Sequence, residues 1–455
     1  MGIKQVKIGV NELTIGMFVS GLDRPWTQTP FPLQGFYIRE IDELRQLKIL
    51  CQWVVIDTEK GRGPIGTKLK TGGVKGSVSA KRDPRSSYSE EVTPIRIQRG
   101  VYTSTKPFQQ EVKHARQLHQ QVYGAVAEVM RQIDANEWGG ASLNETKRVA
   151  SEMVDSVLRN PDAFTWLARV QAKDEYTYSH AVRSSVWAIL FGRHIGLSKR
   201  DLDVLALGVL LKDVGKTALP SELLVKVELS AQEQAKYETF VELGCEILRK
   251  TPNIEPRVIS VVKTHCERLN GSGFPMGLSG DKIPLLGKIA GIVTHYDHIT
   301  NPRGADAPIA PSRAVAKLYE LRQILFQEDL VVEFIRAIGL YPTGTLVELN
   351  SGEVAVVVEQ NFERRLKPKI IIALDSLKRP LSQWVLVDLS EDDKRKQALI
   401  DSGQKTIREV EKVEIARDLE PGSYEVDILA IRDHYFKAVT QKGLKGFLAR
   451  LFSRA

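Results

Sequence analysis

Two short segments of the sequence combine histidine, aspartate and lysine with glycine-containing turns. The first, residues 211–216, reads LKDVGK, and the second, residues 264–275, reads THCERLNGSGFP. Histidine and carboxylate side chains that converge from several helices can hold divalent cations about 3.5–4 Å apart, and such cations activate a hydroxide for attack on a phosphodiester. Each segment joins suitable residues with an unsuitable one, Lys212 in the first and Cys266 in the second.

Together the two segments resemble the pattern of the HD-GYP phosphodiesterases. In that family a His-Asp pair is followed by Gly-Lys, and a His-His-Glu-Arg segment runs into a Gly-aromatic-Pro turn, which here reads GSGFP. The resemblance covers the whole chain, because the Trp-Thr-x-Thr-Pro-Phe loop and the Val-Val-Ile-Asp strand near the N-terminus are similar to the domain of unknown function that precedes many HD-GYP domains. It implies an HD-type helical domain and a ligand that is cyclic di-GMP or a related dinucleotide.

The resemblance also implies which residues should bind metal. The ligand positions with a suitable residue are His180, Asp213, His265 and Asp297, and the altered positions are Lys212, Phe240, Cys266 and Thr294. A phenyl ring cannot ligate, a threonine hydroxyl is a poor ligand, and a lysine ammonium repels a divalent cation. We therefore expect the two-metal mechanism to be lost, with one weakly held ion as the alternative.

Two residues could replace a missing metal ligand. Cys266 could bind zinc or iron as a thiolate, although a single cysteine is more often a small buried side chain. His295 adjoins Thr294 and could replace the missing ligand from a shifted angle. A surface or capping role for His295 is the simpler interpretation.

Lys212 and Lys216 flank Asp213 in the sequence, four residues apart. Our hypothesis is that the Lys212 ammonium takes the place of a cation and pairs with Asp213 and Asp297. The same lysines could hold a phosphate by charge. The alternative is that Lys212 points into solvent. If activity is retained, Asp213 and Lys216 are the expected catalytic residues and iron or manganese the expected cofactor; otherwise no cofactor is expected.

The glycine loop, residues 271–275, keeps its shape with phenylalanine in place of tyrosine. Glycines let a backbone approach a ligand closely, and the resemblance implies a dinucleotide pocket here and contacts with diguanylate-cyclase-type partners. The alternative is a turn that merely joins two core helices. The residues expected to bind ligand are Lys212, Lys216, Arg268, Gly273, Phe274, Pro275 and Arg303.

The elements that position these residues are expected to be helices. Apolar residues three or four apart predict helices over residues 108–134, 143–159, 180–196, 199–211, 231–250, 256–265 and 285–299. Ser198 and Ser230 are expected caps, the latter with Glu233 in a capping box, while Gly196 and Gly215 are expected helix ends. Beyond residue 340 the pattern alternates as in strands.

The fold class that follows is multi-domain and mainly α, with a small N-terminal α/β domain and a C-terminal β-rich appendage. The predicted parts are the α/β domain at residues 1–59, a linker at 60–100, the helical domain at 101–340, the β-rich extension at 341–430 and a basic amphipathic tail at 431–455. In the tail, apolar and basic residues suit a membrane surface or a partner groove. A helix folded onto its own domain is the alternative.

Composition limits the remaining possibilities. The formal net charge of +8 arises mainly between residues 60 and 85, where eight basic residues face one acid. That stretch has few apolar or aromatic residues, so we expect a disordered tether and no nucleic-acid binding; a polyanion or membrane-surface contact is the alternative. The sequence has no long apolar segment or signal peptide and no CxxC motif, which predicts a cytoplasmic protein without disulfides.

Two hypotheses for function remain. The first is a catalytically inactive HD-GYP protein that acts in cyclic di-GMP signalling as a nucleotide sensor or protein-interaction module. The second is an active metal-dependent cyclic di-GMP phosphodiesterase with a reduced or re-formed metal centre.

Overall fold

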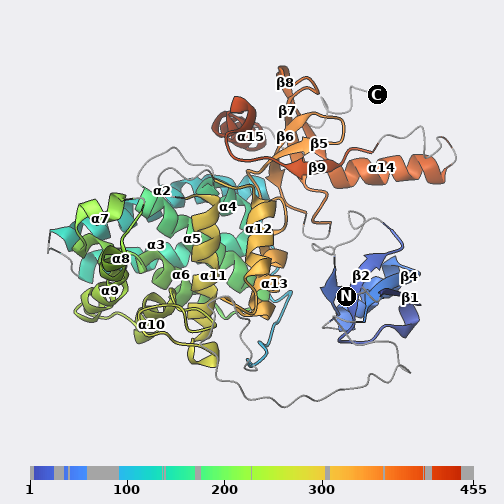
Figure 1. Ribbon diagram of the computed structural model, residues 1–455. Helices are drawn as coiled ribbons and strands as arrows, with labels where there is room; N and C mark the ends of the chain where they lie inside the picture. Colours follow the sequence, from blue (N-terminus) through green and yellow to red (C-terminus); the bar gives the residue numbers. More distant parts are fainter. Residues whose placement is uncertain are drawn as a thin grey trace, which may run out of the picture. The chain divides into compact units, whose positions relative to one another are not determined.

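The described chain is mainly helical, with two antiparallel sheets (Figure 1). The computed structural model describes residues 5–24, 35–38, 41–58, 92–135, 137, 140–169, 176–226, 228–302, 308–361, 364–402, 404 and 412–441. The predominance of helices together with two small antiparallel sheets confirms the predicted multi-domain, mainly α fold class.

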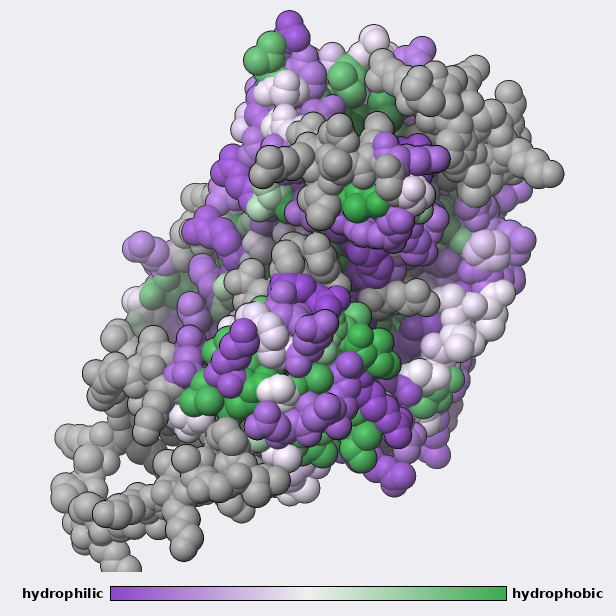
Figure 2. All heavy atoms as spheres, turned by 90° about the vertical axis from the view of Figure 1, so that its right-hand side faces the viewer, coloured by the Kyte–Doolittle hydropathy of each residue, from purple (hydrophilic) through white to green (hydrophobic). Residues whose placement is uncertain are grey.

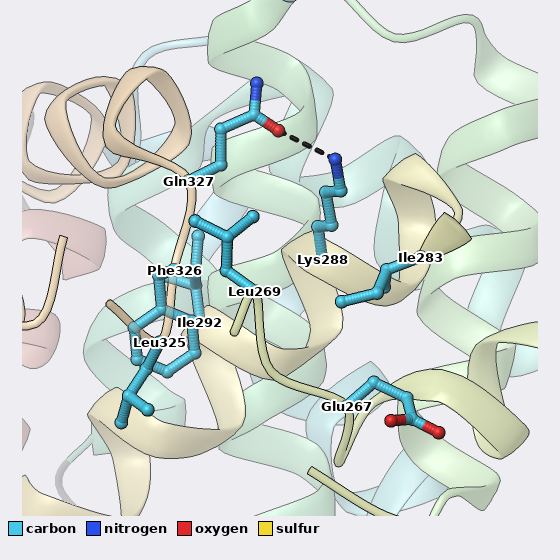
Figure 3. Close-up of a pocket in the computed structure, with 8 residues that line it drawn as sticks. All are labelled: Glu267, Leu269, Ile283, Lys288, Ile292, Leu325, Phe326 and Gln327. Carbon is cyan, nitrogen blue, oxygen red and sulfur yellow. Dashed lines mark hydrogen bonds between the residues drawn. The ribbon is translucent and has the colours of Figure 1, made fainter. Parts of the chain in front are cut away.

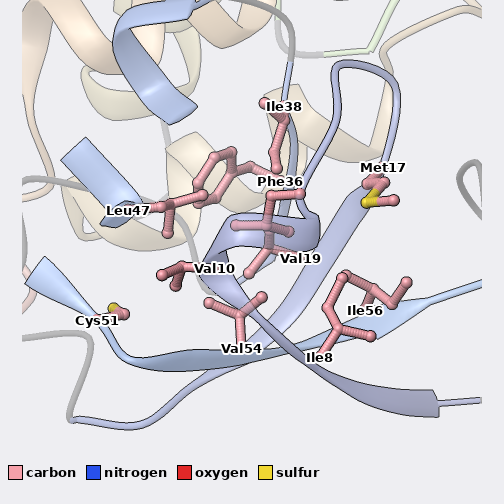
Figure 4. Packing of buried hydrophobic residues seen from close by; sticks show 11 residues of the cluster. Ile8, Val10, Met17, Val19, Phe36, Ile38, Leu47, Cys51, Val54 and Ile56 are labelled. Atoms are coloured by element: carbon pink, nitrogen blue, oxygen red, sulfur yellow. The ribbon is translucent and has the colours of Figure 1, made fainter. Parts of the chain in front are cut away.

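The N-terminal unit contains a sheet with strand order β1-β4-β2-β3. Its elements are β1 (Gln5–Gly9), a 3-10 turn (Val10–Glu12), β2 (Phe18–Leu22), β3 (Phe36–Tyr37), α1 (Ile41–Leu50) and β4 (Trp53–Asp57). Ile8 of β1 pairs with Val54 of β4, and Leu47 of α1 packs into the same apolar core (Figure 4). Alternating strand residues and one helix face therefore build a small α/β core, as the sequence predicts.

The helical body carries the candidate site. Its helices are α2 (Phe108–Asp134), α3 (Gly140–Arg159), α4 (Pro161–Arg169), α5 (Tyr176–Ile195), α6 (Lys199–Leu211), α7 (Ser221–Val225), α8 (Ala231–Glu238), α9 (Phe240–Arg249), α10 (Pro256–Thr264), α11 (Leu285–Thr300), α12 (Pro311–Glu320) and α13 (Glu328–Ile338). Short 3-10 helices occupy Val214–Ala218 and Gly280–Lys282. Nearly all of α6 from Leu202 onward is buried, which places the end of this helix deep in the body.

The predicted helix caps agree with the structure at three positions. The Ser198 hydroxyl accepts a hydrogen bond from the amide of Asp201, and Ser230 forms the expected capping box with Glu233. Gly196 follows α5 directly with a φ of 81°, where a side chain would be strained. Local capping chemistry was therefore readable from the sequence.

Two boundary predictions were wrong. Gly215 does not end a helix but lies within the 3-10 helix, where a Cβ atom would be 1.9 Å from the carbonyl oxygen of Phe240. The helix predicted over residues 231–250 is divided into α8 and α9 at Thr239. The Thr239 hydroxyl donates to the carbonyl of Lys236, 2.7 Å away, and such a local hydrogen bond competes with regular helix geometry.

The second sheet has strand order β8-β7-β6-β5-β9. Its elements are β5 (Leu346–Leu349), β6 (Val354–Glu359), β7 (Lys369–Leu374), β8 (Pro380–Asp388) and β9 (Ile415–Asp418), with α14 (Leu389–Asp401) after β8 and a 3-10 turn at Ser423–Glu425. The turn between β5 and β6 contains Gly352 with a φ of 82°. The β-rich extension predicted after residue 340 thus also contains a helix.

The final described helix, α15 (Ile428–Gln441), folds onto the helical body. The rings of Tyr435 and Phe436 lie 5.6 and 5.7 Å from the ring of Phe108 at the start of α2. This part of the predicted tail follows the alternative in which the terminal helix packs on its own chain. The basic residues proposed for a membrane surface fall in 442–455, outside the described residues, as does most of the predicted linker.

Large apolar side chains exposed on the described surface are scattered, among them Ile49, Val225 and Leu377. On the face displayed in Figure 2, hydrophobic residues are interspersed with hydrophilic ones. Within the described part of the chain, the helices lack the combination of length and apolar character needed to cross a membrane.

Candidate functional site

A group of charged side chains is buried where several elements of the helical body meet. Its members are His180 and Arg183 from α5, Lys212 and Asp213 at the end of α6, Lys216 in the following 3-10 helix, His265 at the end of α10 and Asp297 in α11; we call them the charged cluster. Lys212 and Asp297 are completely buried. All four residues expected to remain from a metal site therefore lie in one cluster.

Asp297 is neutralised by groups from α5. The guanidinium of Arg183 donates to both carboxylate oxygens, at 2.9 and 3.1 Å, and Nδ1 of His180 lies 2.7 Å from Oδ2. Burial opposes ionisation of Asp297, but the charge of Arg183 and the hydrogen bond to His180 outweigh it and lower the pKa to about 2. Asp297 is therefore an ionised carboxylate that already has a protein cation.

Asp213 is held between two lysines. The ammonium of Lys212 contacts Oδ2, and Nζ of Lys216 lies 2.7 Å from Oδ1. Burial would raise the pKa of Asp213, but the two ammonium charges hold it well below its usual range. Lys216 lies three residues after Asp213, and its side chain reaches the carboxylate from the 3-10 helix that follows α6.

These contacts refine the hypothesis for Lys212. Its side chain is fully buried, so the alternative in which it points into solvent was wrong. Its direct ion pair is with Asp213, whereas Asp297 uses Arg183 instead. Burial lowers the pKa of Lys212, and contact with Asp213 counteracts that effect.

Both histidines of the cluster are neutral near pH 7. Burial and the nearby charge of Lys212 lower the pKa of His180 to about 4 and that of His265 to about 3. Nδ1 of His265 donates to the carbonyl of Val262 at 2.7 Å, so Nε2 carries the lone pair. With three cations against two carboxylates, the cluster carries one net positive charge.

This arrangement does not fit a two-metal centre. A divalent ion beside Asp213 would have to displace the Lys212 ammonium, and one beside Asp297 would meet the Arg183 guanidinium. Across the described residues, no group of three or more His, Cys, Asp and Glu side chains is arranged to hold a metal ion. Asp213 and Asp297 are instead compensated by the chain's own cations.

The altered ligand positions contribute packing. The Phe240 ring lies 5.9 Å from the His265 ring and 6.1 Å from the Phe274 ring, and the Lys216 ammonium lies 4.9 Å from its centroid. Cys266 packs against the apolar cluster around Phe240, where burial raises its thiol pKa to about 12 and disfavours a thiolate ligand. Aromatic packing thus occupies the side of the cluster that faces the glycine loop.

His295, considered above as a substitute metal ligand, lies outside the charged cluster. Its ring lies 5.3 Å from the ring of Phe326, and burial and the charge of Arg268 lower its pKa to about 4. Thr294, beside it, has a buried hydroxyl without a hydrogen-bond partner. His295 therefore packs on an aromatic side chain rather than joining the charged cluster.

The glycine loop is fixed by a buried carboxylate. Glu267, only 4% exposed, accepts hydrogen bonds from the amides of Met276 and Leu278, both at 2.8 Å. At Gly273 a Cβ atom would lie 2.4 Å from the carbonyl oxygen of Cys266, so glycine is required by close backbone contact. The backbone after the loop is thus tied to the segment that precedes it.

Of the expected ligand-binding residues, Phe274 joins the aromatic packing beside Lys216, while Arg268 is used internally. The Arg268 guanidinium donates to the carbonyls of His265 and Glu267 at 3.2 and 2.8 Å. Arg303 lies outside the described residues. Sequence reasoning missed Arg183 and Glu267; a charged residue one turn after His180 in a mostly apolar helix was the signal for the first.

Two family models match this chain. Residues 168–327 match an HD domain, which spans the charged cluster and the glycine loop. Residues 5–137 match a domain of unknown function, DUF3391, which includes the N-terminal sheet and extends through α2.

The chain is also similar in sequence to named cyclic dinucleotide phosphodiesterases. A cyclic di-GMP phosphodiesterase of Pseudomonas aeruginosa is 29% identical over 84% of this chain and 88% of its own length. A 3'3'-cGAMP-specific phosphodiesterase of Vibrio cholerae is 32% identical over 36% of this chain and 31% of its own length. A cyclic di-GMP phosphodiesterase response regulator of Xanthomonas campestris is 28% identical over 43% of this chain and 52% of its own length.

Proposed function

We propose, for a chain homologous to the cyclic di-GMP phosphodiesterases of the HD-GYP family, that this protein takes part in cyclic dinucleotide signalling without hydrolysing the dinucleotide. Its role would be that of a nucleotide sensor or protein-interaction module. The observation that carries the proposal is the Lys212 ammonium, buried against Asp213 at a ligand position.

The physical reason is that an ammonium supplies charge but no nucleophile. In hydrolysis of this class, bound metal ions generate a hydroxide and neutralise the leaving oxygen. Lys212 neutralises Asp213 but cannot lower the pKa of a bound water in this way, since it has no vacant coordination position. On this proposal the charged side chains stay packed together, but no bound metal ion is present to activate a water molecule.

Phosphate binding remains compatible with the charges of the site. The cluster has one net positive charge, and the side chain of Lys216 is 15% exposed, compared with 0% for Lys212 and 9% for Arg183. Lys216 is therefore the cation of the cluster best able to meet a phosphate. Phe274, which is only partly buried and packs against Phe240 beside Lys216, offers aromatic surface to a base.

The second candidate is an active phosphodiesterase with a reduced metal centre, iron or manganese being the expected ion. It is favoured by the convergence of His180, Asp213, His265 and Asp297 in one cluster. In that case Asp213 and Lys216 would be the catalytic residues. Contacts of the glycine loop with diguanylate-cyclase-type proteins and a cytoplasmic location stay predictions.

Binding and hydrolysis of cyclic di-GMP, measured together on the full chain expressed with manganese or iron, test the proposal. We expect binding by calorimetry, no linear product by chromatography, and affinity weakened about 5- to 10-fold by Lys216→Ala, since a charged hydrogen bond to phosphate is lost. Lys250→Ala, at an exposed lysine, is the control.

Each other outcome has a distinct meaning. Turnover, or two tightly bound metal ions per wild-type chain, would establish the second candidate instead. Absence of both binding and turnover would remove the sensor role and leave the interaction module. Metal analysis of Lys212→His beside wild type shows whether Lys212 alone keeps the ion out.

A further inference from the structure

A segment that begins within the last residues of the predicted linker (60–100) lies along the helical body. We call residues 92–106 the strap. Toward its end, the amide of Gln98 donates to the carbonyl of Ile195 at 3.0 Å, the Tyr102 hydroxyl donates to the carbonyl of Leu197 at 2.8 Å, and the amide of Thr105 donates to the carbonyl of Arg159 at 3.1 Å. The strap is thus fastened to the ends of α5 and α3.

Its strongest anchor is Arg99. The guanidinium donates to both carboxylate oxygens of Glu333 in α13, at 2.9 and 2.6 Å. Glu333 is 3% exposed and also contacts His194 and Arg336, at 3.0 and 2.8 Å. A bidentate, charge-assisted contact on a buried carboxylate resists detachment.

The first anchor of the strap, at Thr93, is exposed and weaker. The Thr93 amide donates to Oδ2 of Asp281 at 2.9 Å, the Thr93 hydroxyl donates to the same oxygen, and the Gln327 side chain donates to the Thr93 carbonyl at 3.1 Å. The Asp281 side chain is 46% exposed. Solvent competes for such hydrogen bonds, so the strap should detach from this end first.

Asp281 lies in a turn that is bonded to the segment around the glycine loop. The amide of Gly280 donates to the carbonyl of Leu269 at 2.9 Å, and Asn270 and Ser279 form an isolated β-bridge. The same turn follows Met276 and Leu278, whose amides Glu267 holds. A displacement of the turn would therefore act on both sides of the loop.

A small cavity beside the Thr93 anchor is lined by Gln327, which contacts Thr93, and by Lys288. Lys288 donates to Gln327 at 2.9 Å and lies 3.2 Å from Asp281. Figure 3 shows Lys288 and Gln327 joined by this hydrogen bond, in a small cavity that Glu267 and Leu269 also line. Thr93, its two side-chain partners and the carboxylate that fixes the loop thus belong to one contiguous region.

We propose that the strap is a positioning segment for the glycine loop, released from the Thr93 end while Arg99 stays bound. When Thr93 leaves Asp281 and Gln327, the turn at Gly280–Lys282 loosens, and with it residues 276–279 and the glycine loop. The strap follows residues 59–91 in the chain, so its Thr93 end is the end nearest the N-terminal unit in sequence. This inference does not depend on dinucleotide binding.

Hydrogen exchange of backbone amides, followed by mass spectrometry on the full chain, tests the proposal. Thr93→Val removes the hydroxyl donor, and Asp281→Asn weakens the acceptor. In each variant we expect exchange in residues 276–283 to accelerate about threefold or more, because at least one exposed hydrogen bond of the Thr93 anchor has been weakened. Thr103→Val, at an exposed threonine later in the strap, is the matched control.

The comparison within each molecule distinguishes a local from a global effect. Residues 176–195 of α5 and 354–359 of β6 should exchange at the wild-type rate in all variants. Unchanged exchange at 276–283 in both anchor variants would overturn the proposal. A uniform increase that includes α5 and β6 would also overturn it, because the anchor would then contribute only to global stability.

Discussion

The charged cluster and the glycine loop lie in the same helical body and are held together by different kinds of interaction. In the cluster, the carboxylates of Asp213 and Asp297 are paired with cations of the chain, Lys212 and Arg183. In the loop, Glu267 and Gly273 still support the backbone through hydrogen bonds and close contact. The difference indicates that the shape of the site is maintained by interactions that do not require a metal.

The largest effect is expected from removing the cluster's buried ammonium. Lys212→Ala leaves Asp213 with Lys216 alone and opens a cavity, so the free energy of unfolding should fall by about 3–5 kcal/mol. Urea denaturation of the full chain measures the change. Lys250→Ala should alter it by less than about 0.5 kcal/mol. A loss for Lys212→Ala as small as that control would mean that the ammonium does not stabilise the cluster.

A second, smaller effect should follow from pH. His180 and His265 have folded pKa values of about 4 and about 3, whereas the unfolded imidazole titrates near 6.5. Between these values the unfolded chain binds more protons, so stability is present near pH 7 and is lost as pH falls below about 6.5.

The expected loss between pH 7 and pH 5 is about 2 kcal/mol for each of these histidines, by the same linkage. Urea midpoints at the two pH values test it. His265→Gln should reduce the pH dependence, while His114→Gln, at an exposed histidine, should leave it as in wild type. Equal pH dependence in all three proteins would contradict the buried, neutral state of His265.

The smallest effect concerns the loop. Glu267→Gln preserves shape but replaces one acceptor oxygen with a donor amide, so one bond to the amides of Met276 and Leu278 is lost. We expect stability to fall by about 1–2 kcal/mol, with exchange of residues 276–278 accelerated locally. Glu246→Gln on the exposed side of α9 is the control. A loop that exchanges as in wild type would show that Glu267 is dispensable for its order.

Much of the helical body could be predicted because apolar periodicity and capping are local properties. The predicted ranges 108–134 and 199–211 coincide with α2 and α6, and the prediction of 285–299 differs from α11 by one residue. Helices α4 and α13 were missed, although α13 is longer than the predicted α10. The split at Thr239, where the hydroxyl bonds to the carbonyl of Lys236, lies within an otherwise regular apolar pattern and was not predicted.

The sequence by itself determined the residue types at the site: two histidines, two aspartates and two lysines of the cluster, and the glycine loop. Tertiary structure decided the partners. Only packing assigned Arg183 to Asp297 and brought Thr93 to Asp281 across a long stretch of sequence. The reason is that periodicity and caps act over a few residues, whereas the pairing of a buried charge depends on how distant elements meet.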